Sequence, residues 1–577
     1  MNLLPFGDLP PFEPRRFVPA VIDLGDWTAL APLFDQLEAR AAACTNGHDF
    51  ERWLRDWSEL SAAIGQQSSC RYIAMTCHTD SAEAKQAYLD FVEHVEPQLK
   101  PRQFRLAEIF LKHPQRTALP KARYEVLDRD NAVTVELFRE QNVPLETEET
   151  KLGQQYQELT GAMMVSFRGG EKTLQQMAPF YEEPDRAVRQ QAWELVVNRR
   201  LQDAEPMETI FDGLMKLRAQ IGTNAGFANY RDFAWRKLRR FDYTPAHCEQ
   251  FHDAIENEIV PLMKELQEHR RAQLGVTALR PWDIEVDPLN RPPLKPFQTV
   301  DEMLRGTQAI FDKVDAEMGR GFRQMRDLHL LDLDSRKGKA PGGYQQNLDE
   351  SRLPFIFMHS VGVQRDLDIL LHEYGHAWHA FAAQHEPLVS YRSAPIEFCE
   401  VASMSMELIG ADLLEEFYPP ADANRARRKC LEGIVTVFSW IATGDAFQHW
   451  LYTHPAHTRA ERTAAWVAIA QRFGGAVDWS GLETARAKLW HRQLHFFLYP
   501  FYYIEYAIAQ LGALQVWANW RRDRPSAIAA YKRGLTLGGA RPLPELFAAA
   551  GCKFDFSPQA VRPLMEMVRR ELDSLKA

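Results

Sequence analysis

The sequence predicts a mainly α-helical protein with two or three lobes and little β-sheet. Long charged stretches carry apolar residues at three- and four-residue spacing, which is the period of an α-helix. Strand signals are confined to three short stretches. The chain has 577 residues, whereas one hydrophobic core stops growing near ~250–300 residues. A single core therefore cannot serve the whole chain.

The helical stretches follow one another along most of the chain. Pro184 and Asp185 suit the start of one of them, and Gly222 suits its end. A pair of prolines precedes the last of them. The apolar spacing predicts helices over residues 80–115, 121–142, 184–222 and 415–452.

The remaining stretches contain the strand signals and one proline-rich break. Residues 161–174 predict a hairpin that turns at a pair of glycines, and residues 342–347 and 353–360 predict two further strands. Residues 280–296 are rich in proline and form the best candidate linker. We therefore predict an N-terminal helical lobe at 1–200, a bridging helical segment at 201–295 and a third part at 296–577.

Composition limits the partners and the compartment. A net charge of −10 and a pI of about 6.0 argue against nucleic acid as the main partner, because phosphates require clustered Lys and Arg. The seven cysteines contain no CxxC pair, which fits free thiols in a reducing compartment. Polar residues and a proline interrupt the apolar stretch at 496–520, which favours a buried helix over a membrane span. The N-terminus carries no secretory pattern. We expect a cytoplasmic protein.

Residues 370–381, LLHEYGHAWHAF, contain the pattern HExxH. On a helix, His372 and His376 lie ~40° apart and one turn along the axis, so both imidazoles can reach one zinc ion. Glu373 points ~100° away from His372, which places its carboxylate beside such a metal. That is where a general base for a water molecule should stand.

The rest of this helix, expected over residues 366–383, indicates burial. Gly375 in its middle permits close approach of another backbone. His379 shares the histidine face but lies ~10 Å from His372 along the axis, too far for one zinc ion to hold both. We expect His379 near the site without contact to the metal. The opposite face is apolar and carries Leu371, Tyr374, Trp378 and Phe381.

A third ligand must come from another segment, and SAPIEFCEVASMSMELIG supplies candidates. This stretch predicts a helix over residues 395–410 that carries Glu397, Glu400 and Glu407 among apolar residues. Carboxylates in such surroundings are costly unless they are paired or bound to metal. We take Glu400 as the third ligand, and Glu397 and Glu407 as acceptors that orient the histidine rings. A solvated acidic face is the alternative. The set suits one zinc ion per chain, with cobalt or manganese left open.

The stretch HFFLYPFYYIEYAIAQ, residues 495–510, gathers one histidine and four tyrosines. Tyr499, Tyr503 and Tyr506 repeat at helical spacing, and neutral donors such as Tyr O–H or His495 N–H can stabilise the oxyanion of peptide hydrolysis. We expect Tyr503 or Tyr506 to supply that donor, and Tyr502, on another helix face, to contribute little. An aromatic core stripe is the alternative.

Several separate stretches resemble the M3 family of zinc metallopeptidases, within the thimet oligopeptidase-like clan, and most closely its oligoendopeptidase F branch. FIFMHSVGVQRDLDILLHEYGHAWH (355–379) is similar to the family's strand, loop and HExxH helix. EFCEVASMSMEL (397–408) and HFFLYPFYYIEYA (495–507) are similar to its glutamate-bearing helix and its His-and-tyrosine motif. DSRKGKAPGGYQ, NAGFANYRDFA and LGGARPLPELFAAAG also look like family segments. The resemblance covers roughly residues 160–570.

The resemblance implies a site and a fold. It implies two helical lobes around a deep substrate channel, with zinc at the floor and a small β-sheet beside the HExxH helix. Such a channel admits short peptides and excludes folded proteins. The zinc ligands would be His372, His376 and Glu400, the base Glu373, and the substrate and transition-state contacts His495, Tyr499, Tyr503 and Tyr506.

The strand PFIFMHS would line this channel. A strand with a free edge can pair with an extended peptide through main-chain hydrogen bonds, which fixes the substrate's register and leaves side-chain specificity broad. The expected substrate-binding residues are Phe355, Ile356, Phe357, Met358 and His359.

We therefore expect a zinc-dependent endopeptidase that hydrolyses internal bonds of short peptides. A carboxypeptidase or dipeptidase on a related helical scaffold is the alternative enzyme. A positive residue such as Arg365 or Arg392, placed to hold a terminal carboxylate, would favour it. A peptide-binding protein without catalysis is disfavoured, because every catalytic residue type is present. The cleavage preference and the oligomeric state do not follow from the sequence.

Overall fold

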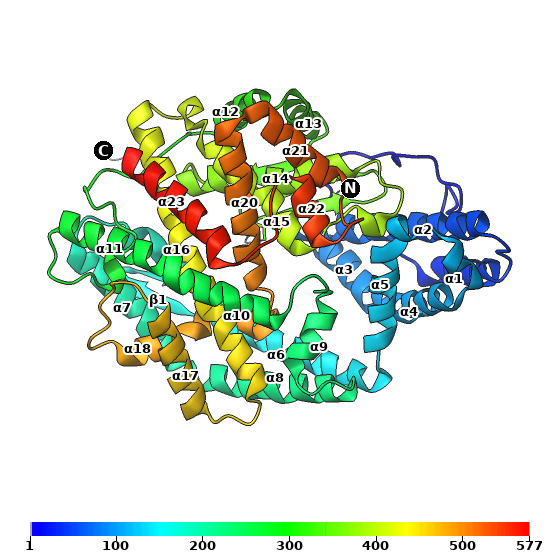
Figure 1. Cartoon of the computed structure of the whole chain (residues 1–577), viewed down its shortest axis with the longest axis horizontal. Coiled ribbons are helices and arrows are strands. Elements are labelled where there is room, and N and C mark those ends of the chain that lie inside the picture. The colour runs from blue at the N-terminus through cyan, green and yellow to red at the C-terminus, as the bar shows by residue number, and fades with distance from the viewer. Residues whose placement is uncertain (1–2, 341, 576–577) are drawn as a thin grey trace.

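In the computed structural model, the chain folds into a mainly α-helical protein with two small β-sheets (Figure 1). The structure describes residues 3–340 and 342–575. The strands are β1 Met164–Phe167, β2 Gly170–Thr173, β3 Leu331–Asp334, β4 Tyr344–Leu348 and β5 Leu353–Ser360. The α-helices are α1 Trp27–Ala41, α2 Gly47–Cys77, α3 Ala82–Asp90, α4 Glu96–Lys112, α5 Lys121–Leu137, α6 Val143–Gly161, α7 Arg186–Gln202, α8 Ala204–Asn224, α9 Tyr230–Lys237, α10 Pro245–Ala254, α11 Val260–Leu274, α12 Val300–Val314, α13 Ala316–Asp327, α14 Gln364–Ala383, α15 Ile396–Ala411, α16 Pro420–Thr453, α17 Arg459–Arg472, α18 Glu483–Ala487, α19 Leu494–Leu498, α20 Ile504–Arg522, α21 Arg524–Thr536, α22 Leu543–Ala549 and α23 Pro558–Ser574.

The predicted helical stretches are present, but several are divided. The stretch at 184–222 divides at Asp203 into α7 and α8, and Pro206 lies in the first turn of α8, where a missing N–H costs nothing. The stretch at 496–520 divides into α19 and α20, because Pro500 disfavours the helical conformation of the residue before it. One continuous helix over 496–520 was therefore a wrong prediction.

The hairpin β1–β2 confirms the strand signal at 161–174, and its register pairs Met164 with Thr173. The second sheet has the order β3-β5-β4, with β3 parallel and β4 antiparallel to β5. Strand β3 was not predicted from the sequence. The predicted strand PFIFMHS forms β5, but both of its edges are paired, so the expectation that it offers a free edge was wrong.

The same pairing corrects the residues expected to bind substrate. Phe355, Ile356, Phe357 and Met358 are at most 1% exposed, because α14 covers the sheet beside the central strand. His359 is half-buried, and its Nε2 bonds the Ala340 carbonyl. The outer strand β4 leaves one edge of the sheet unpaired by another strand. In the described part of the chain, the free edges of this sheet therefore belong to the outer strands β3 and β4 and not to β5.

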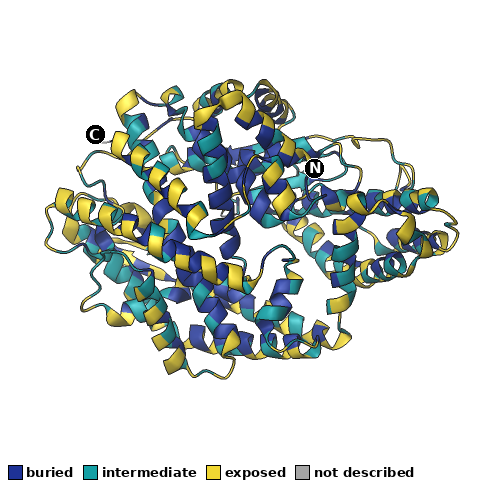
Figure 2. Cartoon of the chain, in the orientation of Figure 1, coloured by how far each residue is buried: buried dark blue, intermediate teal, exposed yellow. Residues whose placement is uncertain are grey.

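Two hydrophobic clusters form the interior. The smaller one gathers buried side chains from residues 18–127, and Figure 1 shows helices α1–α5 together at one end of the molecule. The larger one draws mainly on residues 156–575. Helices at the centre of the view, α20 among them, are buried along most of their length (Figure 2). The proposed lobe boundaries near residues 200 and 295 stay predictions.

One helix in the described part of the chain, α16, is long and apolar enough to cross a membrane by length and composition alone. Its most apolar stretch is 61% buried inside the protein. The core helix of a large helical protein has the same property, so the length of α16 is weak support for a membrane span.

Lys339 ties the segment after β3 to the end of β5. Its ammonium group is fully buried and donates to the carbonyls of Asp332, Asp334 and Met358 at 2.6–3.0 Å. It also pairs with the Asp332 carboxylate at 3.0 Å. The charge is thus matched by acceptors on both β3 and β5, which fixes the relative position of the two strands.

We predict that Lys339→Met destabilises the protein by about 3 kcal/mol, because it leaves buried carbonyls unpaired while Arg336 still neutralises Asp332. Thermal unfolding should show a melting temperature several degrees lower. Lys337→Met is the matched control, because Lys337 is exposed two residues away. Equal melting temperatures for the two variants would contradict this account of the sheet.

Candidate metal centre and active site

The contact between α14 and α15 positions the candidate metal ligands. A Cβ added at Gly375 would lie 2.5 Å from Ser403 Cα and 2.7 Å from the Ala402 carbonyl oxygen. Only glycine permits this approach of two helix backbones, as the sequence predicted. The Tyr531 hydroxyl donates to the Ala402 carbonyl at 2.7 Å and holds α15 from its other side.

The start of α14 is equally well fixed. Asp366 is buried, and its Oδ2 accepts the backbone N–H groups of Val361, Gly362 and Val363 at 2.7, 2.8 and 3.1 Å. This carboxylate satisfies the backbone donors of the loop just before α14 and joins the end of β5 directly to the helix. The HExxH turn therefore follows a rigid corner. Helix α14 begins two residues before the predicted 366 and ends at the predicted 383, and α15 matches the predicted 395–410 within one residue.

The three candidate ligand atoms lie close enough together to surround one metal ion. His372 Nε2 lies 3.2 Å from His376 Nε2 and 3.4 Å from Glu400 Oε2, and His376 Nε2 lies 3.6 Å from Glu400 Oε2. A tetrahedral zinc ion with bonds of ~2.0–2.1 Å separates its ligands by ~3.3–3.4 Å. The triangle therefore has the size that zinc requires. Both histidines stay partly exposed, with 25% and 19% of their side chains open.

Neighbouring side chains orient these ligands. Glu407 Oε1 lies 2.6 Å from His372 Nδ1, which leaves Nε2 of that ring free for a metal. Ser403 Oγ donates to Glu400 Oε2 at 2.8 Å. Burial lowers the pKa of His372, but the Glu407 hydrogen bond and the nearby carboxylates outweigh it and raise this pKa to about 9.

Glu397, expected to orient a histidine, and His379, expected near the site, both have their contacts away from the ligand triangle. Glu397 accepts a 2.6 Å hydrogen bond from the Tyr243 hydroxyl and contacts no histidine of the HExxH turn through a hydrogen bond among the described residues. It lies almost a full turn before Glu400, and its carboxylate faces Tyr243 in the segment after α9. His379 is buried, packs edge-on against Phe398, and burial lowers its pKa to about 4. Its geometry is that of a neutral core histidine.

Glu373 lies beside the ligand triangle and against the edge strand β4. Burial raises the pKa of its carboxyl to about 7, and the charge on His372 opposes that rise. The Gln345 backbone N–H of β4 also holds this pKa down. Because backbone groups alternate in direction along an antiparallel strand, the Gln345 N–H points away from β5 and toward Glu373. The unpaired edge of β4 therefore faces the candidate base.

The tyrosines lie around a sharp turn between α19 and α20, and not along one helix as predicted. Phe501 is fully buried and has φ = +67°, a conformation that costs a non-glycine residue about 1–3 kcal/mol. Its N–H donates to Gln448 Oε1 at 2.6 Å, and its carbonyl accepts from the buried Arg240 guanidinium. Arg240 also pairs with Glu505 at 2.8 Å. Side chains from two distant segments thus hold this turn in place.

This turn changes which tyrosines approach the ligands. Burial raises the pKa of Tyr506 and Tyr502, and the negative charge of Glu400 adds to both shifts. Burial also raises the pKa of Tyr503 to about 12, with Arg492 and Trp440 acting on its hydroxyl. The charge of Glu400 thus makes Tyr502 a further candidate donor beside Tyr506, and the expected role of Tyr503 stays a prediction. Tyr499 is 53% exposed at the outside of the turn.

His495 lies among the same rings, with its centroid 4.9 Å from Tyr503 and 6.0 Å from both Tyr502 and Tyr506. Burial lowers its pKa to about 4, so the ring is neutral at pH 7. The Gln493 side-chain amide donates to its Nδ1 at 2.7 Å. That bond places the proton on Nε2, which makes His495 a donor to the site.

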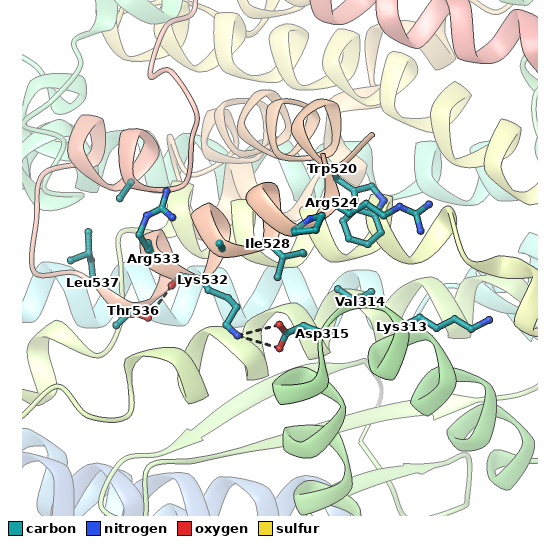
Figure 3. A pocket seen from close by; sticks show the side chains of 13 residues that line it. Lys313, Val314, Asp315, Trp520, Arg524, Ile528, Lys532, Arg533, Thr536 and Leu537 are labelled. Atoms are coloured by element: carbon teal, nitrogen blue, oxygen red, sulfur yellow. Dashed lines mark hydrogen bonds and ion pairs between the residues drawn. The ribbon is translucent and has the colours of Figure 1, made fainter. Parts of the chain in front are cut away.

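A hollow of about 960 Å³ lies elsewhere, between α21 and the corner where α12 meets α13. Figure 3 shows Lys532 of α21 reaching toward Asp315, and Arg524, Arg533 and Lys313 also line the hollow. None of the candidate ligands lines this hollow. It borders Trp378, on the apolar face of α14, through Lys532. It is therefore separate from the histidine site.

Two protein-family models match the chain. A model described as "Peptidase family M3" matches residues 180–565, which include every candidate ligand. The chain belongs to peptidase family M3. A second model, "Peptidase M3 N-terminal domain", matches residues 21–138, the helical part that the sequence resemblance left open.

Named relatives point to the oligoendopeptidase F branch of family M3. The chain is 21% identical over 423 residues to oligopeptidase PepF of Bacillus subtilis (strain 168), covering 69% of this chain and 58% of that protein. It is 30% identical over 159 residues to an oligoendopeptidase F homolog of Lactococcus lactis subsp. lactis, covering 27% of this chain and 25% of the relative. These matches span less than two thirds of the relatives' own lengths.

Solved structures of family M3 match almost the whole chain. PZ peptidase A, solved with an inhibitor, superposes with a TM-score of 0.88 at 28% identity, over 97% of this chain and 99% of that one. A putative oligoendopeptidase F from Bacillus anthracis str. Ames superposes with a TM-score of 0.84 at 25% identity, over 96% and 97% of the two chains. The mainly helical fold class is therefore confirmed.

Sequence reasoning missed four residues that shape this site. Gln345, Arg240 and Gln448 act through backbone groups or distant contacts, for which a single sequence carries no signal. The sequence analysis gave Tyr502 no role because it assumed one continuous helix, which Pro500 interrupts. That proline was the one available signal, since the residue before a proline avoids helix.

We predict that Gly375→Ala weakens zinc binding by about tenfold, because the added methyl group pushes α15 and Glu400 away from His376. Competition with a chromogenic chelator measures the affinity. Gly433→Ala is the control, because Gly433 is exposed in α16 and an added Cβ meets no atom within 4 Å. Unchanged affinity in Gly375→Ala would contradict the role assigned to this contact.

Proposed function

We propose that this member of family M3 is a zinc-dependent endopeptidase that hydrolyses internal bonds of short peptides in the cytoplasm. The triangle formed by His372, His376 and Glu400 carries the proposal, because its edges of 3.2–3.6 Å fit the ligand spacing of tetrahedral zinc. Two histidines and one carboxylate also leave a fourth position open, as in catalytic zinc sites. Seven free cysteines in the described chain suit a reducing compartment.

When bound, zinc supplies a Lewis acid that polarises a carbonyl group and lowers the pKa of water. Glu373, beside the ligands but not among them, takes the proton of the attacking water and passes it to the leaving amine. Its burial keeps this carboxylate close to the reacting groups and out of bulk solvent. The backbone N–H of Gln345 orients it toward the ligand triangle.

The tyrosine turn supplies neutral donors for the charge that develops on the carbonyl oxygen. Tyr502 and Tyr506 lie toward Glu400, and burial keeps their hydroxyls protonated. His495 adds a neutral N–H. Donors fixed in a partly desolvated site stabilise an oxyanion more than the neutral carbonyl, so their effect falls on the transition state.

The edge of β4 gives the substrate its register in this proposal. Its outward backbone groups face Glu373, and an extended peptide can add to such an edge by main-chain hydrogen bonds. Recognition through the backbone is compatible with many side chains. A site of this kind accepts extended short peptides and not the folded surface of a globular protein.

The exopeptidase alternative loses support from Arg392. Its Nε, Nη1 and Nη2 donate to the carbonyls of Glu386, Asp349 and Pro387 at 2.7–3.3 Å. A guanidinium engaged in this way is not available for a substrate carboxylate. Arg365 is exposed in the first turn of α14. The geometry therefore favours an endopeptidase.

We predict that the zinc-loaded protein cleaves an internally quenched peptide that is blocked at both ends. Cleavage should stop on chelation and return on addition of zinc. Mass spectrometry of the products identifies the bonds cut. Activity confined to peptides with a free terminus would instead establish the exopeptidase.

We predict that Glu373→Gln keeps its zinc and its melting temperature but loses turnover by about 10²–10⁴, the usual contribution of a general base. Metal analysis and steady-state kinetics on the same preparation separate binding from chemistry. Glu386→Gln is the control, because Glu386 lies after α14 and pairs with Arg123, away from the ligands. Turnover close to that of the parent protein would assign the base to another group.

We predict that Tyr506→Phe and Tyr502→Phe lower kcat by about 10²–10³ with little change in KM, as expected when an oxyanion donor is lost. Tyr503→Phe should have little effect, because its hydroxyl faces Trp440. Phe keeps the packing in all three variants. Near-normal kcat in the first two would leave the cluster as aromatic core.

A further inference from the structure

A second cluster of metal-ligand side chains lies between α10 and α16. Cys248 and His252 stand one turn apart on α10, and Asp445 and His449 stand one turn apart on α16. Side chains four residues apart share a helix face, so each helix presents a pair to the other. All four are buried, with exposed fractions of 1%, 2%, 0% and 6% in that order.

The distances suit a single ion. His449 Nε2 lies 3.3 Å from Asp445 Oδ2, the spacing of two ligands on one tetrahedral zinc ion. Cys248 Sγ joins them, since one ligand atom from each of Cys248, Asp445 and His449 lies within 4.8 Å of the others. His252 Nε2 lies 2.9 Å from the same Asp445 oxygen and can donate a hydrogen bond to it.

The protein alone does not satisfy this cluster. Among the described residues, Asp445 Oδ1 and His449 Nδ1 have no hydrogen-bond partner, and His449 Nε2 lies 3.3 Å from Asp445 Oδ2 without the geometry of a hydrogen bond. Each buried polar atom left without a partner costs about 1–3 kcal/mol. These atoms lie on adjacent turns of one helix beside a buried thiol, so the cluster calls for a ligand or for ordered water.

The buried charge of Asp445 also indicates a bound cation. Asp445 is fully buried, and its ion pairs within the described chain involve only His252 and His449, with no lysine or arginine. A buried carboxylate without a permanent cation requires a proton on a neighbouring histidine or a bound metal ion. A divalent cation would balance Asp445 and a Cys248 thiolate together.

We propose that Cys248, Asp445 and His449 bind a second zinc ion, apart from the peptidase site, and that His252 orients Asp445 by donating its Nε2–H. One thiolate, one imidazole and one carboxylate form a donor set of the borderline softness that zinc prefers. The ion would join α10 to α16. It would also stiffen the turn that carries Gln448, whose side chain holds Phe501.

Metal analysis of the full-length protein tests the proposal independently of catalysis. The parent protein should carry two zinc ions per chain, and His376→Ala should keep one. Adding Cys248→Ser to His376→Ala should remove it. One zinc ion in the parent and none in His376→Ala would overturn the second site while leaving the proposed peptidase site intact.

Cobalt identifies the ligand directly. In the cobalt-loaded His376→Ala protein, we expect a thiolate-to-cobalt charge-transfer band in the near ultraviolet, because the His372 site contains no thiolate. The band should vanish in His376→Ala with Cys248→Ser. It should persist with Cys552→Ser, since the Cys552 thiol is buried and bonds only backbone carbonyls. Absence of the band, or its survival without Cys248, would overturn the assignment.

Discussion

The backbone contact between α14 and α15 at Gly375 is the constraint on which the candidate site depends. The two histidines belong to one helix and Glu400 to the other, so their distances follow from how closely the helix axes approach. Ser403 and Ala402, which touch Gly375, flank the same turns of α15 that carry Glu400 and Glu407. The lack of a side chain at Gly375 therefore determines both the ligand triangle and the hydrogen bond that orients His372.

A second constraint comes from polar groups buried between segments that are remote in sequence. Arg240 is fully buried and links the Phe501 carbonyl to Glu505, while its guanidinium lies over the Trp235 ring at 4.5 Å. Tyr243, three residues later, binds Glu397 on α15. The segment after α9 thus touches the tyrosine turn and the glutamate-bearing helix at once. The orientation of the catalytic groups is shared among segments that are remote in sequence.

Local patterns in the sequence predicted the parts of the site that are local in the fold. HExxH needs one helix turn, and Glu400 could be chosen because a carboxylate in an apolar helix requires a partner. The edge strand and the tyrosine turn could not be found in this way. Strand order depends on β3, which is only four residues long, and the turn depends on Arg240 and Gln448. For both the strand order and the tyrosine turn, contacts between distant segments decide the geometry. The hydrophobic period of a single sequence reports only local structure and does not reveal such contacts.

The clamp on Phe501 also bears on the order in which the protein becomes active. His372 and Glu407 are 35 residues apart, so the metal-binding helices can meet early, whereas Arg240 and Phe501 are 261 residues apart. Closing the longer loop costs more chain entropy and comes later in folding. In a newly made chain, His372, His376 and Glu400 would therefore come together before the turn at Phe501 takes its final position.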